Sequence, residues 1–267
     1  MAGPTTAERG ARRPARRPRQ ESGPPSGPPA RARFRPGRRG LLIALAALAL
    51  TAGVLWLLYG SSWTRVERVR TSGAEVLTVA QIVRAADVPL GEPVVSLDTG
   101  AVEDRIRERL PRVDSVTVAR DWPRGVTLEV TERQPVLLLV QGKRFVEVDD
   151  EGVRFATVER PVKGVPRLEL AAEGSPSLRR FPVARLTEEA VRVRGDLPRR
   201  VTAELRTLVV RSYDDMVLEL TRDRTVVWGS PEEGEAKARA LTALLKAAPR
   251  ARHFDVSAPT APAVSGS

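Results

Sequence analysis

The stretch VARDWPRGVTLEVTERQP, residues 118–135, decides the fold. From Val126 to Thr131 apolar and polar residues alternate strictly, so Val126, Leu128 and Val130 share one face of a strand. The residues before it alternate in the same way, and DWPRG between the two runs contains the proline and the glycine of a hairpin loop. The sequence therefore predicts a β-hairpin, and nothing in this hairpin is typical of a catalytic site.

Composition excludes several classes of enzyme. The chain of 267 residues contains no cysteine and one histidine, His253, so thiol nucleophiles, cysteine-rich zinc sites and paired-histidine metal sites cannot be built. A Ser-His-Asp triad would depend on His253, which we interpret as a strand or surface residue. Asp149, Asp150 and Glu151 could supply the carboxylates of a wall hydrolase, but acids before a glycine are more typical of a tight turn. We predict no enzymatic activity, no cofactor and no metal.

The positive charge belongs to the N-terminal segment. The formal net charge is +11, and residues 1–40 contain eleven arginines and two acidic residues. This segment is rich in proline and glycine and contains one aromatic residue, Phe34. It therefore lacks the stacking residues of a nucleic-acid-binding surface. We predict a disordered cytoplasmic tail over residues 1–40 and no nucleic-acid partner.

A candidate membrane anchor follows the tail. The run LLIALAALALTAGVLWLLY begins at Leu41, ends at Tyr59 and contains nineteen residues without a charge. As a helix it would be about 29 Å long, close to the ~30 Å hydrocarbon thickness of a bilayer. Arginines precede it, while Trp56, Tyr59 and Trp63 gather at its other end, as in an interfacial aromatic belt. We predict a transmembrane helix over residues 41–60, with a cytoplasmic N-terminus and an extracytoplasmic remainder.

Two alternatives to an anchor are less favoured. A cleaved signal peptide usually has an apolar run of about 7 to 15 residues, and this run is longer and lacks a small-residue cleavage site after it. A helix buried in a soluble core seldom finds apolar contacts all around its circumference.

The residues after the anchor divide into two patterns, and the first spans residues 64–132. A weak strand in VERVRT is followed by a helix that begins at Thr78, with Gln81 in the position of a capping box. A second helix begins at Asp98 or Thr99, and the hairpin comes next. The order is β-α-α-β-β, in which two amphipathic helices can cover one face of a three-stranded sheet.

The second pattern, residues 133–258, consists of short strands separated by turns, as in a mostly antiparallel sheet. A helix is predicted from Pro231 to Ala247, with Ser230 as its N-cap and Glu233 completing a capping box. HFDVS is predicted to be a late strand, and residues 259–267 a flexible tail. The predicted fold class is α+β.

The order of these features resembles the FtsQ/DivIB family of bacterial cell-division proteins. The most specific shared positions are Arg120, Trp122, Pro123, Glu132, Arg133 and Pro135, then Asp149, Gly152 and Phe155, then Pro166 and Leu168. The resemblance covers roughly residues 41–258. It implies a POTRA domain over 64–132, a β domain after it, and a non-enzymatic role in assembling the division machinery at the septum.

The resemblance also suggests roles for the hairpin residues. Trp122 and Pro123 would shape the hairpin loop, and Glu132 with Arg133 would fix the junction between the two domains. Equally, Trp122 could fill a gap in the sheet and the Glu-Arg pair could be a solvated strand end, because exposed ion pairs contribute only about 0 to 1 kcal/mol.

Partners are implied by the resemblance as well. They are other membrane division proteins, namely small coiled-coil proteins of the FtsB and FtsL type and the septal wall-synthesis complex; a small-molecule substrate is not expected. In the family the C-terminal end of the β domain binds such a coiled-coil protein, which points to residues 253–264. The candidate partner-binding residues are Phe254, Val256, Ser257, Ala263 and Val264. A strand edge there could accept a strand from the partner, although these residues could instead close the domain's own sheet.

A different class of function is a POTRA module that handles polypeptides in secretion or envelope assembly. A single POTRA unit behind a membrane anchor, without the sequence of a large barrel, argues against it.

Overall fold

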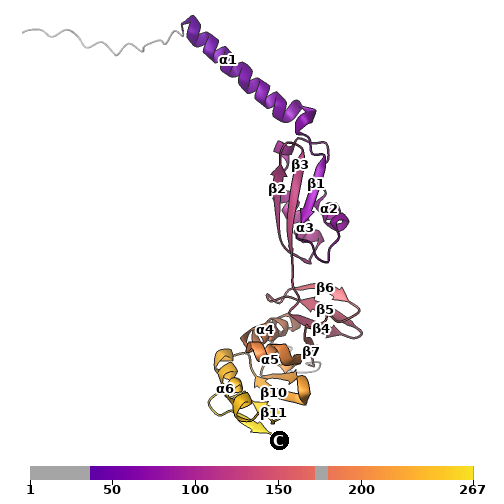
Figure 1. Ribbon diagram of the computed structural model, residues 1–267, viewed down its shortest axis with the longest axis vertical. Coiled ribbons are helices and arrows are strands. Elements are labelled where there is room, and N and C mark those ends of the chain that lie inside the picture. Colours follow the sequence, from indigo (N-terminus) through magenta and orange to yellow (C-terminus); the bar gives the residue numbers. More distant parts are fainter. Residues whose placement is uncertain (1–36, 172–179, 267) are drawn as a thin grey trace, which may run out of the picture. The chain divides into compact units, whose positions relative to one another are not determined.

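The structure, a computed structural model, describes residues 37–171 and 180–266. These residues form an N-terminal helix and two folded parts built from strands and helices (Figure 1). The predicted tail, residues 1–40, lies outside the described residues except for its last four. The α+β class is confirmed.

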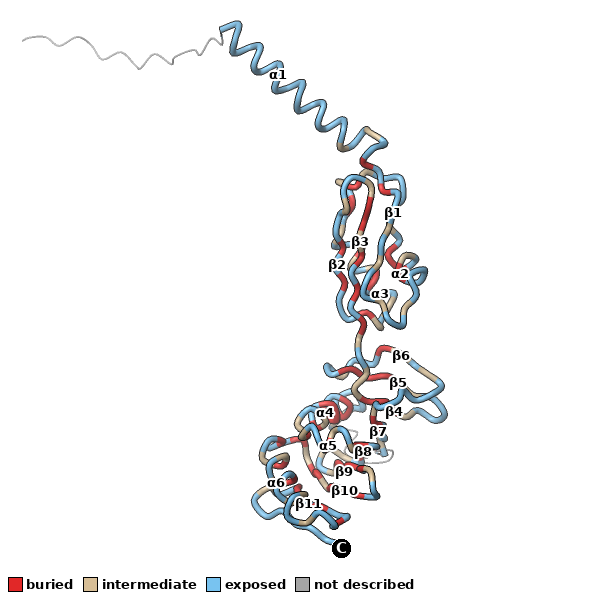
Figure 2. Tube along the Cα trace, in the orientation of Figure 1, coloured by how far each residue is buried: buried red, intermediate tan, exposed pale blue. Residues whose placement is uncertain are grey.

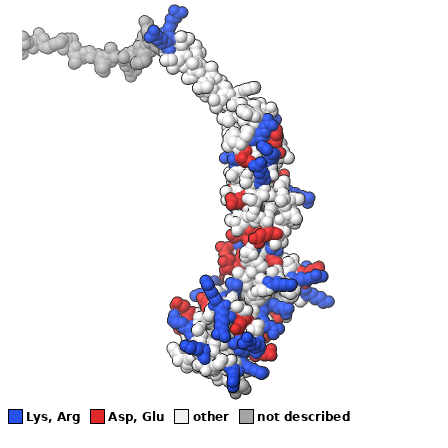
Figure 3. Space-filling model, viewed as in Figure 1, with Lys and Arg blue, Asp and Glu red and all other residues white. Residues whose placement is uncertain are grey.

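The N-terminal helix contains the predicted membrane span. Helix α1 (Arg38–Leu55) continues into the π-helical turn η1 (Trp56–Gly60). The whole segment is long and apolar enough to cross a membrane, and none of its residues is buried (Figure 2). Beyond the arginines at its start it carries no charged side chain (Figure 3). The candidate transmembrane helix is therefore present and begins three residues before the predicted position.

The first folded part has the predicted β-α-α-β-β order. The elements after the short turn η2 (Ser62–Thr64) are β1 (Arg68–Ser72), α2 (Val79–Ala86), the short turn η3 (Val94–Ser96), α3 (Thr99–Arg109), β2 (Val113–Asp121) and β3 (Gly125–Glu132). In the sheet β3 is central, parallel to β1 and antiparallel to β2. The hairpin of the opening stretch is therefore β2 and β3.

The predicted helix starts are confirmed by their caps. The amide of Gln81 donates to the Thr78 hydroxyl at 3.3 Å, and the amide of Thr78 donates to the Gln81 side chain at 2.8 Å. At the second helix Asp98 accepts from the amide of Ala101 at 3.1 Å. Both side chains satisfy amides that have no partner inside the first turn of a helix.

The core of this part lies between the sheet and the two helices. Val126, Leu128 and Val130 are all buried, and they pack in one cluster with Ile82 of α2 and Ile106 of α3. The strand face predicted from alternation is therefore the core face, and the helices cover it.

Leu128→Ala is expected to lower the free energy of unfolding by about 2 to 5 kcal/mol, because it opens a cavity in a closely packed core. Glu129→Ala, on the exposed face of the same strand, should change it by less than about 0.5 kcal/mol. Denaturant titration of both variants measures the difference, and equal effects would contradict this assignment of faces.

The second folded part is one sheet of nine strands in the order β12-β11-β10-β9-β8-β7-β4-β5-β6. The strands are β4 (Leu137–Gln141), β5 (Arg144–Val148), β6 (Arg154–Val158), β7 (Arg167–Leu170), β8 (Leu205–Ser212), β9 (Asp215–Leu220), β10 (Arg224–Gly229), β11 (His253–Asp255) and β12 (Ala263–Ser265). Most neighbours are antiparallel, and the pairs β4–β7, β7–β8 and β10–β11 are parallel.

One face of this sheet is covered by helices. They are α4 (Val183–Asp196), α5 (Arg199–Glu204) and α6 (Gly234–Ala247). Leu186 of α4 and Leu241 of α6 belong to the same buried cluster as Leu208 and Leu218 of the central strands. Trp228 is fully buried in this cluster.

Sequence reasoning missed α4, α5 and β7. A signal for α4 exists, because Leu186, Ala190 and Val193 recur at helical spacing after Pro182. All three are fully buried. The many charged residues between them hide the pattern.

The start of α6 differs from the prediction. The helix begins at Gly234, and its N-terminal neighbour Glu233 has φ of 55°, a left-handed conformation that a helix cannot include. Ser230 therefore lies too far from the first turn to cap it. Its carbonyl oxygen instead accepts from the Lys237 ammonium at 2.8 Å, and burial of that ammonium lowers the pKa of Lys237.

The C-terminal segment also differs from the flexible tail predicted over residues 259–267. Residues 263–265 form β12, which pairs antiparallel with β11. The amide of Arg252 also donates to the carbonyl oxygen of Gly266 at 2.8 Å. The prolines Pro259 and Pro262 lie in the connection between the two strands, where no ladder hydrogen bond is needed.

Candidate functional site

Glu132, at the end of β3, holds the connection between β1 and α2. Its side chain is buried, and one carboxylate oxygen accepts from the amides of Glu75, Val76 and Leu77 at 2.9, 3.0 and 2.8 Å. Burial by itself raises the pKa of Glu132, but these three amides and Arg112 outweigh it and hold the pKa below its usual value. Glu132 therefore acts inside the first folded part, and it is neither a solvated strand end nor a contact with the second.

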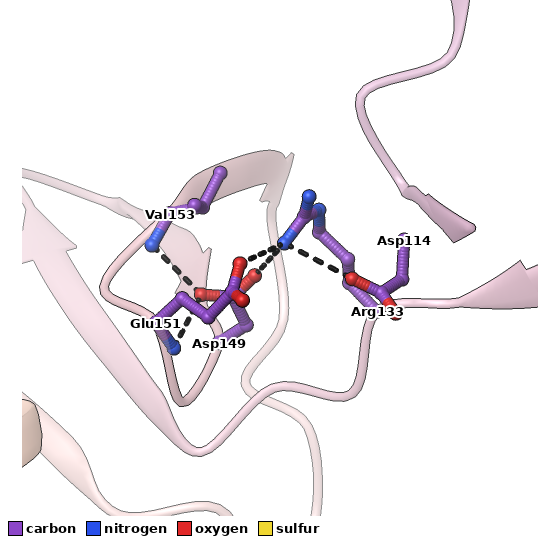
Figure 4. A network of polar contacts seen from close by, with 5 residues as sticks. All are labelled: Asp114, Arg133, Asp149, Glu151 and Val153. Carbon is purple, nitrogen blue, oxygen red and sulfur yellow. Dashed lines mark hydrogen bonds and ion pairs between the residues drawn. The ribbon is translucent and has the colours of Figure 1, made fainter. Parts of the chain in front are cut away.

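Arg133, the next residue, does reach the second domain (Figure 4). One guanidinium nitrogen lies 2.5 Å from Asp149, 3.2 Å from Glu151 and 3.4 Å from Asp114. Burial alone would lower the pKa of Arg133. The hydrogen bonds to Asp149 and Glu151 outweigh burial and raise this pKa above its usual value. The guanidinium thus links the end of β3 to the turn between β5 and β6.

Asp149 organises that turn. One of its oxygens faces Arg133, and the other accepts from the amides of Glu151 at 3.1 Å and Val153 at 2.7 Å (Figure 4). Gly152 has φ of 84° at the tip of the turn, where a side chain would be strained. The acidic cluster is therefore a turn with a buried ion pair, in keeping with the turn interpretation of the sequence.

A second ion pair, which the sequence did not predict, also joins the two folded parts. Arg112 lies 2.7 Å from Glu147, whose side chain is 3% exposed, and the Arg112 guanidinium lies over the ring of Phe155 at 5.2 Å. The carbonyl oxygen of Arg112 also accepts from the amide of Arg133 at 2.8 Å. The sequence signal for this ion pair is the charged Glu147 inside the otherwise apolar run FVEV of β5.

The other hairpin residues lie within or beside the POTRA fold. Arg120 donates to the carbonyl oxygens of Val94 at 3.1 Å and Leu97 at 2.7 Å. Trp122 is 49% exposed at the tip of the hairpin, joined to Pro123 by a cis peptide bond, so it does not fill a gap in the sheet. Pro135 lies in the connector between β3 and β4.

The candidate partner-binding residues divide into two groups. Phe254 and Val256 are buried in the core of their own domain, so their side chains serve its fold, as in the alternative in which they close the domain's own sheet. Their side chains belong to the cluster between the sheet and the helices, and β12 covers the backbone edge of β11. Ser257 is exposed, and its hydroxyl donates to Asp255 at 2.7 Å. Ala263 and Val264 are exposed on β12.

The free edge of the sheet is β12. The amide of Thr225 donates to the carbonyl oxygen of Arg252, and the amide of Val256 donates to that of Val227, so the backbone groups of Phe254 face β10 and those of His253 and Asp255 face β12. His253 lies opposite Ser265 and Asp255 opposite Ala263, so these pairs carry the ladder hydrogen bonds and the amide and carbonyl of Val264 point away from β11. No other described strand lies beyond them. A pocket of about 420 Å³ beside this edge is lined by Val264 and by the residues that connect α6 to β11.

Comparison with known proteins shows which family the chain resembles. A family model described as POTRA domain, FtsQ-type, matches residues 64–133. The chain is 59% identical to the cell division protein FtsQ of Streptomyces venezuelae over 100% of this chain and 99% of that protein. It is 61% identical to the FtsQ of Streptomyces coelicolor, with 100% of both covered.

Among solved structures it is similar to the major extracytoplasmic domain of the cell division protein DivIB from Geobacillus stearothermophilus. The TM-score is 0.32 and the identity 13%, and the match covers 45% of this chain and 97% of that one.

The likeness to the Streptomyces proteins extends over the whole chain and is not limited to the POTRA domain. The resemblance found in the hairpin motif and the order of domains is thereby confirmed. The chain belongs to the FtsQ family of bacterial cell-division proteins.

Proposed function

We propose that this cell-division protein is a non-enzymatic, single-pass membrane scaffold that recruits and links other division proteins at the septum. Its N-terminus would be cytoplasmic, because Arg38 and Arg39 begin the membrane helix while aromatic residues end it. The folded parts would then lie outside the membrane, the POTRA domain over residues 64–132 and the β domain over residues 133–258. The relatives' shared name as cell-division proteins supports the role.

The observation that carries the recruiting role is the open edge of β12. The outward amide and carbonyl of Val264 can pair with one more strand, and strand addition is a common way to bind an extended segment. The occupant that we propose is an extended segment of a small coiled-coil division protein of the FtsB and FtsL type. Ala263 and Val264 would contact it, and the pocket beside Val264 would accept one of its apolar side chains. Phe254 and Val256 would support the edge from the core.

Val264→Pro tests this docking mode, because it removes the outward amide and leaves the ladder hydrogen bonds of Ala263 and Ser265 to β11 intact. We expect the affinity of the full chain, reconstituted in vesicles, for the purified coiled-coil protein to fall about tenfold or more. Val264→Thr keeps the amide and the branched side chain and should bind like the unchanged chain. Capture is measured by co-sedimentation with the vesicles.

The thermal unfolding midpoint should be nearly unchanged in both variants, which separates docking from folding. Undiminished capture by Val264→Pro would contradict strand addition at this edge. Equal capture of unrelated extended peptides would favour general polypeptide handling over division-specific recruitment.

A further inference from the structure

Three loops of the POTRA domain meet at the end where the chain arrives from the membrane helix. The hairpin tip is hydrogen-bonded to the segment that follows the membrane helix. The Arg124 side chain donates to the carbonyl oxygen of Trp63 at 3.3 Å, and the amide of Glu67 donates to the carbonyl oxygen of Arg124 at 2.9 Å. The loop before η3 is tied there too, because the amide of Gly91 donates to Val66 at 2.9 Å. We call this the helix-proximal end, comprising residues 63–68, 89–93 and 121–125.

The last turn of the membrane helix is held against this end. The Thr64 hydroxyl donates to the carbonyl oxygens of Leu57 at 3.2 Å and Leu58 at 3.0 Å, which satisfies carbonyls that a helix C-terminus leaves free. Thr64 itself is buried, and η1 contacts η3. Only Ser61 to Trp63 separate the helix from the domain, so the helix-proximal end lies within a few residues' reach of Gly60.

Large apolar side chains are exposed at this end. Trp63 is 57% exposed, Leu90 67% and Trp122 49%. They come from three separate loops, and their side chains are not needed to complete the buried core. Tryptophan at such positions is typical of the boundary between water and lipid, where its ring can lie among the headgroups.

Two arginines at or beside this end are paired with acids. Arg124 lies 2.9 Å from Glu67, and Arg70 lies 3.1 Å from Asp121. Arg65, whose side chain donates to the carbonyl oxygen of Gly91 at 3.2 Å, and Arg68 form no ion pair with a described residue, so the lipid composition in the test separates apolar contact from attraction to anionic headgroups.

We propose that the Trp122–Pro123 tip, with Trp63 and Leu90, lies in the headgroup layer of the same bilayer that Arg38–Gly60 spans. The POTRA domain would then rest on the membrane surface in addition to being tethered to it. A protein occupant of this end is the alternative that the experiment distinguishes.

The test uses the full chain in phosphatidylcholine vesicles that contain lipids brominated near the headgroup, which quench tryptophan on contact. A variant with Trp56→Phe and Trp63→Phe retains Trp122 and Trp228; a second variant adds Trp122→Phe and retains Trp228 alone. The difference between the two emissions belongs to Trp122. Trp228, fully buried in the β domain, is the internal reference.

We expect bromination to reduce the Trp122 emission roughly by half, as for residues of an interfacial belt, and to leave Trp228 unchanged. The blue emission of Trp228 reports that each variant is folded. Equal Trp122 emission with and without bromine would overturn the proposal and leave this end to water or a protein partner. Quenching that required added phosphatidylglycerol would overturn it too, because the arginines would then hold the domain.

Discussion

Glu132→Ala is expected to lower the free energy of unfolding by about 3 to 5 kcal/mol, because hydrogen bonds to a charged acceptor are worth roughly 1.5 to 3 kcal/mol each. Three amides of the β1–α2 connection share this carboxylate. Its loss leaves them without an acceptor in a partly buried loop. Denaturant titration followed by circular dichroism measures the change.

Glu129→Ala is the matched control, since it removes an exposed carboxylate from the same strand. A Glu132→Ala effect as small as that of the control would show that water replaces the carboxylate.

The pH dependence of the same residue gives a second readout. Because the folded pKa of Glu132 lies below its unfolded value of about 4.3, the carboxylate stabilises the fold at pH values above about 4.3. This stabilisation is lost as the pH falls from there through the lowered pKa. The difference in unfolding free energy between the unchanged chain and Glu132→Gln should therefore shrink below about pH 4, and parallel pH profiles would contradict it.

Arg133→Ala is expected to cost about 3 to 5 kcal/mol, because it leaves a buried carboxylate without its counter-charge. The side chain of Asp149 is 3% exposed, and that of Arg133 17%. The other two acids that face Arg133 are far more exposed, so they contribute little. The effect should appear in the unfolding of the β5–β6 region, measured by native-state hydrogen exchange.

A double-mutant cycle with Asp149→Asn isolates the pair. We expect a coupling energy of about 2 kcal/mol, within the range for residues in one ion-pair network. The cycle with Glu151→Gln, whose side chain is 69% exposed, is the control and should give less than about 0.5 kcal/mol. Additive effects of Arg133 and Asp149 would show that the ion pair does not hold the junction.

The POTRA fold could be predicted because its signals are local. The alternation that ends at Thr131, the capping box of Thr78 and Gln81, and the proline and glycine of the hairpin loop each act over a few residues. The partners of Glu132 lie on a loop more than fifty residues earlier in the chain, and no local pattern connects them. Long-range hydrogen bonds of this kind depend on the completed fold.

The C-terminal edge of the nine-stranded sheet could be predicted only in part. Alternation places Phe254 and Val256 on one face and His253 and Asp255 on the other, but it does not say which set faces the core. The answer depends on the helices over the sheet and on β12, whose three residues carry too short a pattern to predict a strand. The sequence therefore located the edge approximately: Ala263 and Val264 lie exposed on it, whereas Phe254 and Val256 lie in the core.

The short strand β7 bears on how the β domain folds. Strands β4 to β6 pair in sequence order through tight turns, and so do β8 to β10. Leu168 of β7 lies between Leu139 and Leu208, parallel to both neighbours. Pairings between sequence neighbours form quickly, whereas those that close long loops form slowly. Two antiparallel pieces should therefore form first and β7 should join them last. Until it does, both pieces expose an unpaired edge, which is the state most prone to pair with another chain.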